Sequence, residues 1–209
     1  MHSDIIIRQC TPEDAAEAVP LIVSSGPDAF RYIFSVKSPD DVTSFVTYAF
    51  LDGEGELGYK NHIVLTQAGT VIAVGALWSS KEMLNFTLQG MKQILRAYGV
   101  WQGMKVIRRA LQLESVVQPP QKAIAYLGHF GVVAESRGRG IGTQLIHGLM
   151  DMGQERGFCT YGLDVSVENP RAQELYERLV FRVKSTSQGG EGNGFGRIHD
   201  HHYMECLVE

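Results

Sequence analysis

The sequence lacks any apolar run close to the roughly 20 residues that a membrane-spanning helix requires. Its opening residues, MHSDIIIRQC, also lack the basic and long apolar regions of a signal peptide. The sequence also has no large excess of either charge, because 19 Lys and Arg residues stand against 23 Asp and Glu residues and leave a net charge of −4. That balance gives no overall footprint for nucleic acid or for an anionic membrane. We therefore expect a cytoplasmic protein with neither of these partners.

Cysteine is rare as well, with three residues, Cys10, Cys159 and Cys206, and no CxxC pair among them. This number and spacing exclude a disulfide framework and predict free thiols in a reducing compartment.

A histidine-rich stretch, HDHH at 199–202, raises the question of a metal, since His199 and His201 would share one face of a strand. A zinc site needs a third and a fourth ligand, and no CxxC or HExxH motif accompanies these histidines. We predict no metal, and expect a polar strand that lines an acceptor pocket.

What the sequence does contain is typical of one globular domain over residues 1–209, with 44% hydrophobic and 20% charged residues. Strand patterns alternate with helix patterns, which indicates the α/β class. Strands are predicted at 5–10, 62–78 (a hairpin), 123–133, 160–167, 181–186 and 201–208. Helices are predicted after Thr11, over about 39–51, over 81–113, after the glycines at 138–142, and over 168–179. The loop at 188–196 has five glycines in nine residues, which predicts mobility.

The helical segment 81–113 is basic: its six Lys and Arg against one Glu give 6 − 1 = +5. Its apolar residues recur at three- and four-residue steps and continue after Gly103, which predicts one or two helices. The charge fits either a solvated helix face or a surface for an acidic partner.

The stretch ESRGRGIGTQLIHGLM (135–150) places glycine at every second position before an amphipathic helix pattern. Glycine in a helix interior costs about 0.5–1 kcal/mol relative to alanine, so such a cluster has a local cause. The first amides of a helix are unpaired and electropositive, and an anion reaches them only where no side chain intervenes. Gly138, Gly140 and Gly142 remove those side chains, while Arg137 and Arg139 add positive charge. We predict a phosphate cradle here, in preference to a merely flexible turn.

The spacing of these glycines indicates which class of phosphate ligand the cradle suits. Thr143 occupies the place of the third glycine in GxGxxG, and no lysine completes GxxxxGK[ST], so neither nucleotide fingerprint fits. The pattern that fits is Arg-x-x-Gly-x-Gly, from Arg137 to Gly142.

This pattern resembles the coenzyme A signature of the GCN5-related N-acetyltransferase (GNAT) superfamily, Arg/Gln-x-x-Gly-x-Gly/Ala. The stretch NPRAQELYERLVF (169–181) is similar to that family's Asn-x-x-Ala-x-x-Leu-Tyr-x-x-x-Gly-Phe helix. Val180 stands where glycine is usual, which should change the turn into the next strand without touching ligand contacts. The order of elements matches over nearly the entire chain, although 81–113 is longer than the usual link.

The resemblance implies a mixed, centrally splayed β-sheet flanked by helices, with a helical insertion at 81–113. The strands near 126–132 and 160–166 would diverge in a V that holds the pantetheine arm of acetyl-CoA. Main-chain groups of Val132 and Val133 would bond that arm, and so would Asn169, which is also a helix N-cap. The pyrophosphate would rest on the amides from Arg137 to Thr143, a run that comprises Arg137, Gly138, Arg139, Gly140, Ile141, Gly142 and Thr143.

The resemblance also implies the chemistry, which is attack of an amine on a thioester. The amide of Val132 would stabilise the oxyanion. Tyr176 is the candidate general acid, although its place on an apolar helix face also suits a core residue. Tyr126 and His129 are candidate bases, directly or through water, and only one faces the substrate unless a bulge intervenes. Glutamate, a frequent base in the family, is absent from 123–133, so the base stays open.

The leading hypothesis is an acetyl-CoA-dependent N-acetyltransferase that uses direct attack in a ternary complex. Its acceptor would be a primary amine of a small molecule, a protein N-terminus or a lysine. The alternative is a non-catalytic acyl-CoA-binding regulatory module. We expect the residues that determine specificity for the acceptor to lie in the helices after residue 11, in the segment 81–113 and in the 188–196 loop. Dimerisation is common in such folds, and a homodimer stays open.

Overall fold

A computed structural model describes residues 5–117 and 119–208, which form one seven-stranded sheet with helices on both faces. The strands are β1 (Ile5–Gln9), β2 (His62–Gln67), β3 (Thr70–Trp78), β4 (Ile124–Val132), β5 (Thr160–Ser166), β6 (Arg182–Ser187) and β7 (His201–Leu207). The helices are α1 (Ala15–Ser24), α2 (Pro27–Phe34), α3 (Asp41–Asp52), α4 (Met83–Glu114), α5 (Ile141–Glu155) and α6 (Pro170–Arg178). Single 3-10 turns cover Pro12–Asp14, Tyr59–Asn61 and Ala134–Ser136.

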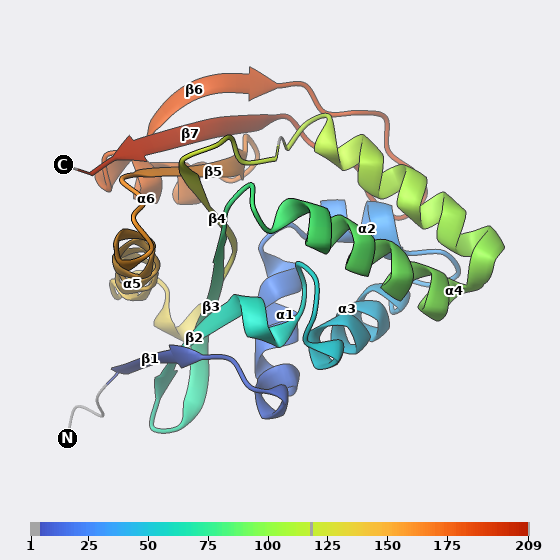
Figure 1. Ribbon diagram of the computed structural model, residues 1–209, viewed down its shortest axis with the longest axis horizontal. Coiled ribbons are helices and arrows are strands. Elements are labelled where there is room, and N and C mark those ends of the chain that lie inside the picture. Colours follow the sequence, from blue (N-terminus) through green and yellow to red (C-terminus); the bar gives the residue numbers. More distant parts are fainter. Residues whose placement is uncertain (1–4, 118, 209) are drawn as a thin grey trace.

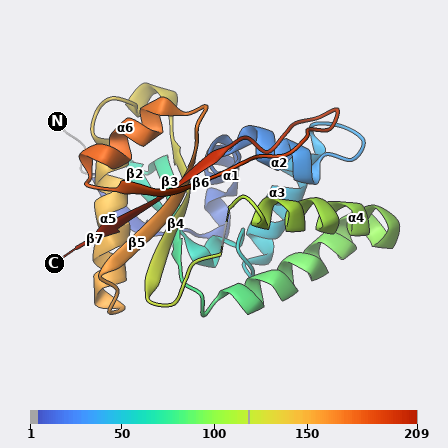
Figure 2. The ribbon, with the colours of Figure 1, turned by 90° about the horizontal axis from the view of Figure 1, so that it is seen from above.

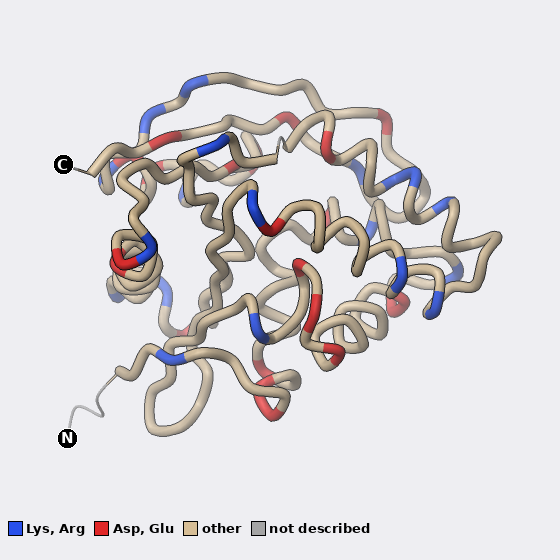
Figure 3. Tube along the Cα trace, viewed as in Figure 1, with Lys and Arg blue, Asp and Glu red and all other residues tan. Residues whose placement is uncertain are grey.

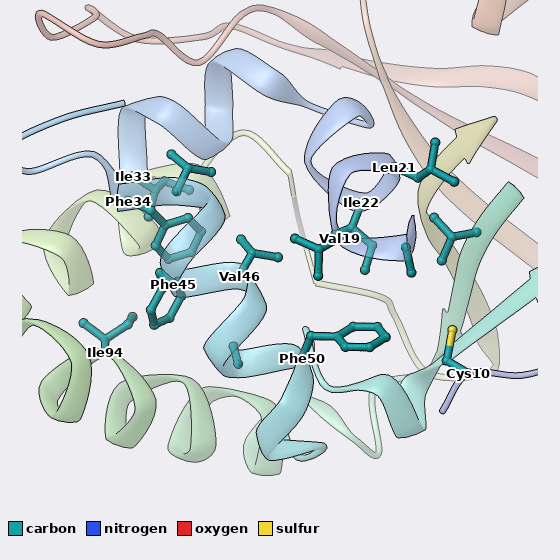
Figure 4. Packing of buried hydrophobic residues seen from close by; sticks show 14 of the residues in the cluster. Cys10, Val19, Leu21, Ile22, Ile33, Phe34, Phe45, Val46, Phe50 and Ile94 are labelled. Atoms are coloured by element: carbon teal, nitrogen blue, oxygen red, sulfur yellow. The ribbon is translucent and has the colours of Figure 1, made fainter. Parts of the chain in front are cut away.

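The helices form two layers around the sheet. Helices α5 and α6 cover one face, and α1 to α4 cover the other (Figure 1). Each layer of helices forms its own hydrophobic core with the sheet, as expected when every helix buries one apolar stripe against the sheet. On the α1–α4 side, the core contains Val19, Ile22, Phe45 and Phe50 (Figure 4). On the other side, α5 packs Leu145 and its neighbours against inward-facing residues of β3, β4 and β5.

The sheet order is β1-β2-β3-β4-β5-β7-β6, and every neighbouring pair is antiparallel except β4 and β5. Those two parallel strands pair only over Ile124–Tyr126 and Thr160–Gly162. Beyond that point β4 runs on to Val132 beside β3, and β5 runs on to Ser166 beside β7. The sheet therefore opens between its two central strands, and the predicted splayed α/β architecture is confirmed.

The helical insertion between β3 and β4 is also confirmed, and it is interrupted at Gly99. Gly99 has φ +69° and ψ 175°, which separates α4 into two helical halves that fold back on each other (Figure 2). Gly103 instead permits their contact, because a Cβ there would lie 3.0 Å from Cδ2 of Leu95.

The periodic leucines of the insertion are not core residues. Leu84, Leu88, Leu95 and Leu111 are exposed, and α4 packs inward through another face that includes Phe86, Ile94 and Val106. Lys and Arg recur along both halves of α4 (Figure 3).

The β6–β7 loop is docked on α2, and close packing accounts for several of its glycines. The Asn193 side chain donates to the carbonyl of Tyr32 at 2.9 Å, and His199 contacts Asp28 at 2.8 Å. A Cβ at Gly196 would collide with the backbone carbonyl of Asp28, and one at Gly189 would collide with that of Ile198.

Val180 does not change the turn into β6, contrary to the expectation from its departure from the family pattern. Its φ is +66°, so valine adopts the left-handed conformation that glycine usually supplies. The amide of Val180 donates to Glu177 at 3.1 Å, and that of Phe181 donates to Tyr176 at 3.0 Å. These two bonds are the helix-ending pattern of a Schellman motif.

Candidate active site

The predicted cradle lies at the start of α5, directly after β4 and the 3-10 turn. Gly138 and Gly140 have φ of +73° and +81°, and Gly140 is the residue that precedes the helix. A Cβ on either would meet nothing within 4 Å, so their missing side chains leave open space. The first intrahelical bond runs from the amide of Gln144 to the carbonyl of Gly140. The amides of Ile141, Gly142 and Thr143 therefore precede the helical ladder and are available to an anion.

Gly142 has a different role from the one predicted. A Cβ there would lie 3.1 Å from Cδ2 of Leu175, so this glycine lets α5 approach α6. Its amide still belongs to the cradle. Ile141 is buried and can offer a ligand only its main chain, whereas the side chains of Arg137 and Arg139 are exposed.

The main chain of Val132 points into the gap between β4 and β5. The amide of Val133 donates to Ile72 of β3 at 3.0 Å, and successive residues of a strand direct their backbone groups to opposite sides. The backbone groups of Val132 consequently face away from β3. Nε of Arg137 donates to the carbonyl of Val132 at 3.0 Å, which ties the cradle to the end of β4.

Asn169 precedes α6 and caps it. Its side-chain oxygen accepts from the amide of Ala172 at 3.2 Å, and the residue is exposed near the end of β5. This is the N-cap role predicted from the Asn-Pro pair. The amide nitrogen of the side chain is left to face solvent or a ligand.

Tyr176 is buried on the inner face of α6. Its ring packs against Phe130 and Phe181, with centroids 6.0 and 6.1 Å away. Burial raises the pKa of Tyr176 well above its ordinary value, so the phenol stays protonated at neutral pH. Within the described residues its hydroxyl has no hydrogen-bond partner. A protonated phenol suits a proton donor, and the ring contacts equally suit a core residue.

A bulge in β4 decides how Tyr126 and His129 are directed. Gly128 pairs with Ala76 and Gly131 pairs with Val74, so two residues of β4 oppose the single residue between those partners. His129 has φ +57° at this bulge. The extra residue turns both side chains toward Trp78, whose ring centroid lies 5.1 Å from Tyr126 and 5.4 Å from His129. The exception to strict alternation therefore applies, and both candidates lie on one face.

Tyr126 is poorly suited to act as a base. Its hydroxyl donates to Oδ2 of Asp164 at 2.7 Å. Burial, with the nearby charge of Asp164, raises the pKa of Tyr126 far above its ordinary value. Burial also raises the pKa of Asp164 to about 6. The phenol is thus a hydrogen-bond donor that links β4 to β5 where the two strands separate.

His129 makes contacts that the sequence did not predict. Its Nδ1 lies 2.9 Å from Nε2 of His62 on β2, and its Nε2 lies 3.3 Å from Oε1 of Glu56. His62 is fully buried, and its own Nδ1 lies 2.9 Å from the carbonyl of Gly58. Neither Glu56 nor His62 belongs to a motif, and only the pairing of β2, β3 and β4 brings them to His129.

A cavity of about 440 Å³ lies between α2, the end of α4 and the β6–β7 loop. Its lining includes Tyr32, Arg108, Arg109 and the loop residues 188–193. It thus brings together the three segments in which specificity was expected.

The histidine-rich stretch is engaged in protein contacts. His199 contacts Asp28, and Nδ1 of His201 donates to the carbonyl of His199 at 2.8 Å. No three His, Cys, Asp or Glu side chains within residues 5–117 and 119–208 are grouped so as to hold a metal ion. All three cysteines are free thiols, as predicted. In the same ranges, no helix combines the length and the apolar character needed to cross a membrane.

Comparison with known proteins points to one superfamily. The model of the acetyltransferase (GNAT) family matches residues 95–181, which contain the cradle and the Asn169 helix. A 5-NmdU N-acetyltransferase of Pseudomonas phage PaMx11 is 33% identical over 86 residues, 41% of this chain and 57% of that protein. The chain spans between about a third and just over half of the length of the curated relatives it matches.

Solved structures share the fold over nearly the whole chain. A crystal structure described as an acetyltransferase superposes with a TM-score of 0.71 and 21% identity, and covers 98% of this chain and 100% of that one. A Salmonella typhimurium protein, solved with its cofactor acetyl-CoA, superposes with a TM-score of 0.54 and 14% identity over 99% of this chain and 95% of that one. The GNAT family model thus matches the segment that carries the cradle and the Asn169 helix, and solved acetyltransferase structures share the fold over nearly the whole chain.

Proposed function

We propose that the chain is an N-acetyltransferase that moves the acetyl group of acetyl-CoA to a primary amine by direct attack in a ternary complex. The observation that carries this proposal is the position of an amide-lined cradle beside the gap between β4 and β5. The cradle suits a diphosphate and the gap suits an extended arm, and coenzyme A joins these two groups in one molecule.

The residues at this site fit the cosubstrate. The amides of Ile141, Gly142 and Thr143, with the open space at Gly138 and Gly140, would hold the diphosphate. Arg139 is exposed beside them and adds positive charge. The backbone of Val132 and the side-chain amide of Asn169 would bond the pantetheine arm. Bound acetyl-CoA supplies an activated acetyl thioester, and the chain supplies its orientation.

Two groups would then assist the transfer. The amide of Val132 would donate to the carbonyl oxygen as negative charge develops there. Tyr176, kept protonated by burial, would give its proton to the departing thiolate. The acceptor would enter from the opposite side, where the 440 Å³ cavity adjoins α2, α4 and the β6–β7 loop. A small amine, a protein N-terminus and a lysine side chain all fit this scheme.

One observation favours a second function, that of a non-catalytic acyl-CoA-binding module. Tyr176 is packed between two phenylalanine rings as an ordinary core residue would be. The two functions are separated by measuring acetyl-CoA affinity by calorimetry and free thiol release over a panel of amines. An acetyltransferase binds acetyl-CoA and releases thiol only when an acceptor is present. A binding module shows the affinity with no amine-dependent release.

A further inference from the structure

The contacts of His129 determine which of its nitrogens carries a proton. Nδ1 of His62 faces a carbonyl, that of Gly58, so this nitrogen must be the N–H of the His62 ring. Burial and the neighbouring His129 lower the pKa of His62 to about 3, so His62 is neutral at physiological pH. Nε2 of His62 therefore has a lone pair and accepts a hydrogen bond from Nδ1–H of His129.

In the neutral tautomer with its proton on Nδ1, His129 has a lone pair on Nε2, which is directed toward Glu56. The two rings are stacked, with centroids 5.1 Å apart and planes 10° apart, which fixes the direction of that lone pair. Oε1 of Glu56 is 3.3 Å from Nε2, so in this tautomer two acceptors face each other. An alkylammonium group offers several N–H donors and satisfies both acceptors at once.

The surroundings suit a cation as well. The rings of Trp78 and Phe30 lie 5.4 and 6.2 Å from that of His129, and aromatic faces attract ammonium groups. Burial is the main cause that raises the pKa of Glu114 and of Tyr126, and the charge of Glu56 makes a smaller contribution to both, so Glu56 acts on the same region. The titratable groups around His129 are then Glu56 from the α3–β2 connection, His62 from β2 and, further off, Tyr126 with Asp164 and Glu114.

We propose that Glu56, His129 and His62 form the site that binds and deprotonates the acceptor, and that the acceptor is a protonated alkylamine. This rests on the proposed function and names its base and its substrate class. Glu56 and His129 contact the ammonium group, so they are catalytic residues. His62 acts through His129, so it is a positioning residue.

The steps balance. The ammonium group donates one N–H to Nε2 of His129 and another to Oε1 of Glu56. Transfer of the first proton to Nε2 leaves a neutral amine and an imidazolium, whose charge Glu56 offsets. The amine lone pair forms the C–N bond as the C–S bond breaks. The thiolate gains a proton from Tyr176, and the second proton, lost by the new amide nitrogen, replaces it on Tyr176 through solvent. The sum is an amide, a free thiol and one proton, which His129 releases to solvent.

The kinetic test uses acetyl-CoA with butylamine, which is protonated at pH 7, and aniline, which is not. We expect His129→Gln to lower kcat for butylamine by about 10²–10⁴-fold, the usual contribution of a general base, with unchanged affinity for acetyl-CoA. Glu56→Gln should raise KM for butylamine about tenfold, the equivalent of ~1.4 kcal/mol, and leave KM for aniline unchanged. The exposed His147→Gln and Glu155→Gln on α5 are the matched controls.

The positioning role of His62 is tested by the pH profile. In His62→Gln a side-chain amide can still accept from His129 and donate to Gly58, whereas His62→Leu can do neither. We expect the loss of activity at acid pH to keep its midpoint in His62→Gln and to shift in His62→Leu. A merely structural role would change the amplitude of both profiles and neither midpoint.

An NMR measurement tests the site independently of turnover. Nitrogen-detected spectra should show neutral His129 with its proton on Nδ1, and butylamine should shift its Nε2 resonance in the wild type but not in Glu56→Gln. The proposal is overturned by a proton on Nε2, by no shift with butylamine, or by wild-type kcat in His129→Gln. If the wild type binds acetyl-CoA and acetylates no amine, the proposed function fails, and the NMR result still decides the ammonium site.

Discussion

Val180→Gly should stabilise the protein, although it deletes a hydrophobic side chain. Val180 has φ +66° and is 61% exposed, so its side chain contributes little burial while its backbone is strained. The left-handed conformation costs an L-residue about 1–2 kcal/mol. Glycine removes that strain and adds roughly 0.5–1 kcal/mol of unfolded-state entropy, so the net stabilisation is about 0.5–1 kcal/mol.

The measurement is urea unfolding at 25 °C, with a thermal melt in parallel. For a chain of this size we expect Tm to rise by about 1–4 °C. Val183→Gly is the matched control: this valine is 43% exposed on β6, where no left-handed strain exists to relieve. It should lose about 1 kcal/mol through glycine's entropy and lost burial. Equal destabilisation by both substitutions would refute the assignment of strain to the α6–β6 turn.

Three further predictions follow from the site. Gly140→Ala places a methyl group in the open space of the cradle and should weaken CoA binding about tenfold or more, which is ~1.4 kcal/mol by calorimetry. Gly69→Ala is the control, because Gly69 has a similar backbone conformation (φ +83°) and open space but lies far from the cradle. An equal loss of CoA affinity in both variants would contradict the cradle assignment. Tyr176→Phe should lower kcat far more than acetyl-CoA affinity, and equal losses would make the ring a packing residue. Asp164 is half-buried, and burial raises its pKa from 3.8 to about 6 in the folded protein. Folding therefore favours its protonated form, so wild-type stability should be full below about pH 4 and fall as pH rises toward 6. Asp164→Asn keeps an acceptor for Tyr126 and should abolish that fall of up to about 3 kcal/mol in urea titrations, and an unchanged slope would contradict the assignment.

The sequence predicted those parts of the molecule that depend on short patterns of neighbouring residues. The cradle needs only a strand, alternating glycines and a helix start, all within residues 124–143. The N-cap of α6 needs only the Asn169-Pro170 pair. The splayed sheet was predicted from the resemblance to a superfamily, because no local pattern in β4 or β5 indicates where their pairing stops.

The parts that the sequence did not predict depend on contacts between distant segments. His62 and Glu56 reach His129 only after β2, β3 and β4 pair, and a bulge in β4 sets the direction of the His129 side chain. Gly99 and Gly103 look alike in the sequence, but one breaks α4 and the other lets its halves pack. The left-handed conformation of Val180 was not predicted, because valine rarely adopts it. The hydrogen bonds at the C-terminal end of α6 impose this conformation.

Above all, we propose that the main-chain amides at the start of α5 bind the diphosphate of coenzyme A. A crystal structure of the chain with acetyl-CoA tests it directly. We expect diphosphate oxygens within hydrogen-bond distance of the amides of residues 138–143, and the pantetheine arm between β4 and β5. A diphosphate held elsewhere on the protein, with these amides facing only solvent, would contradict it.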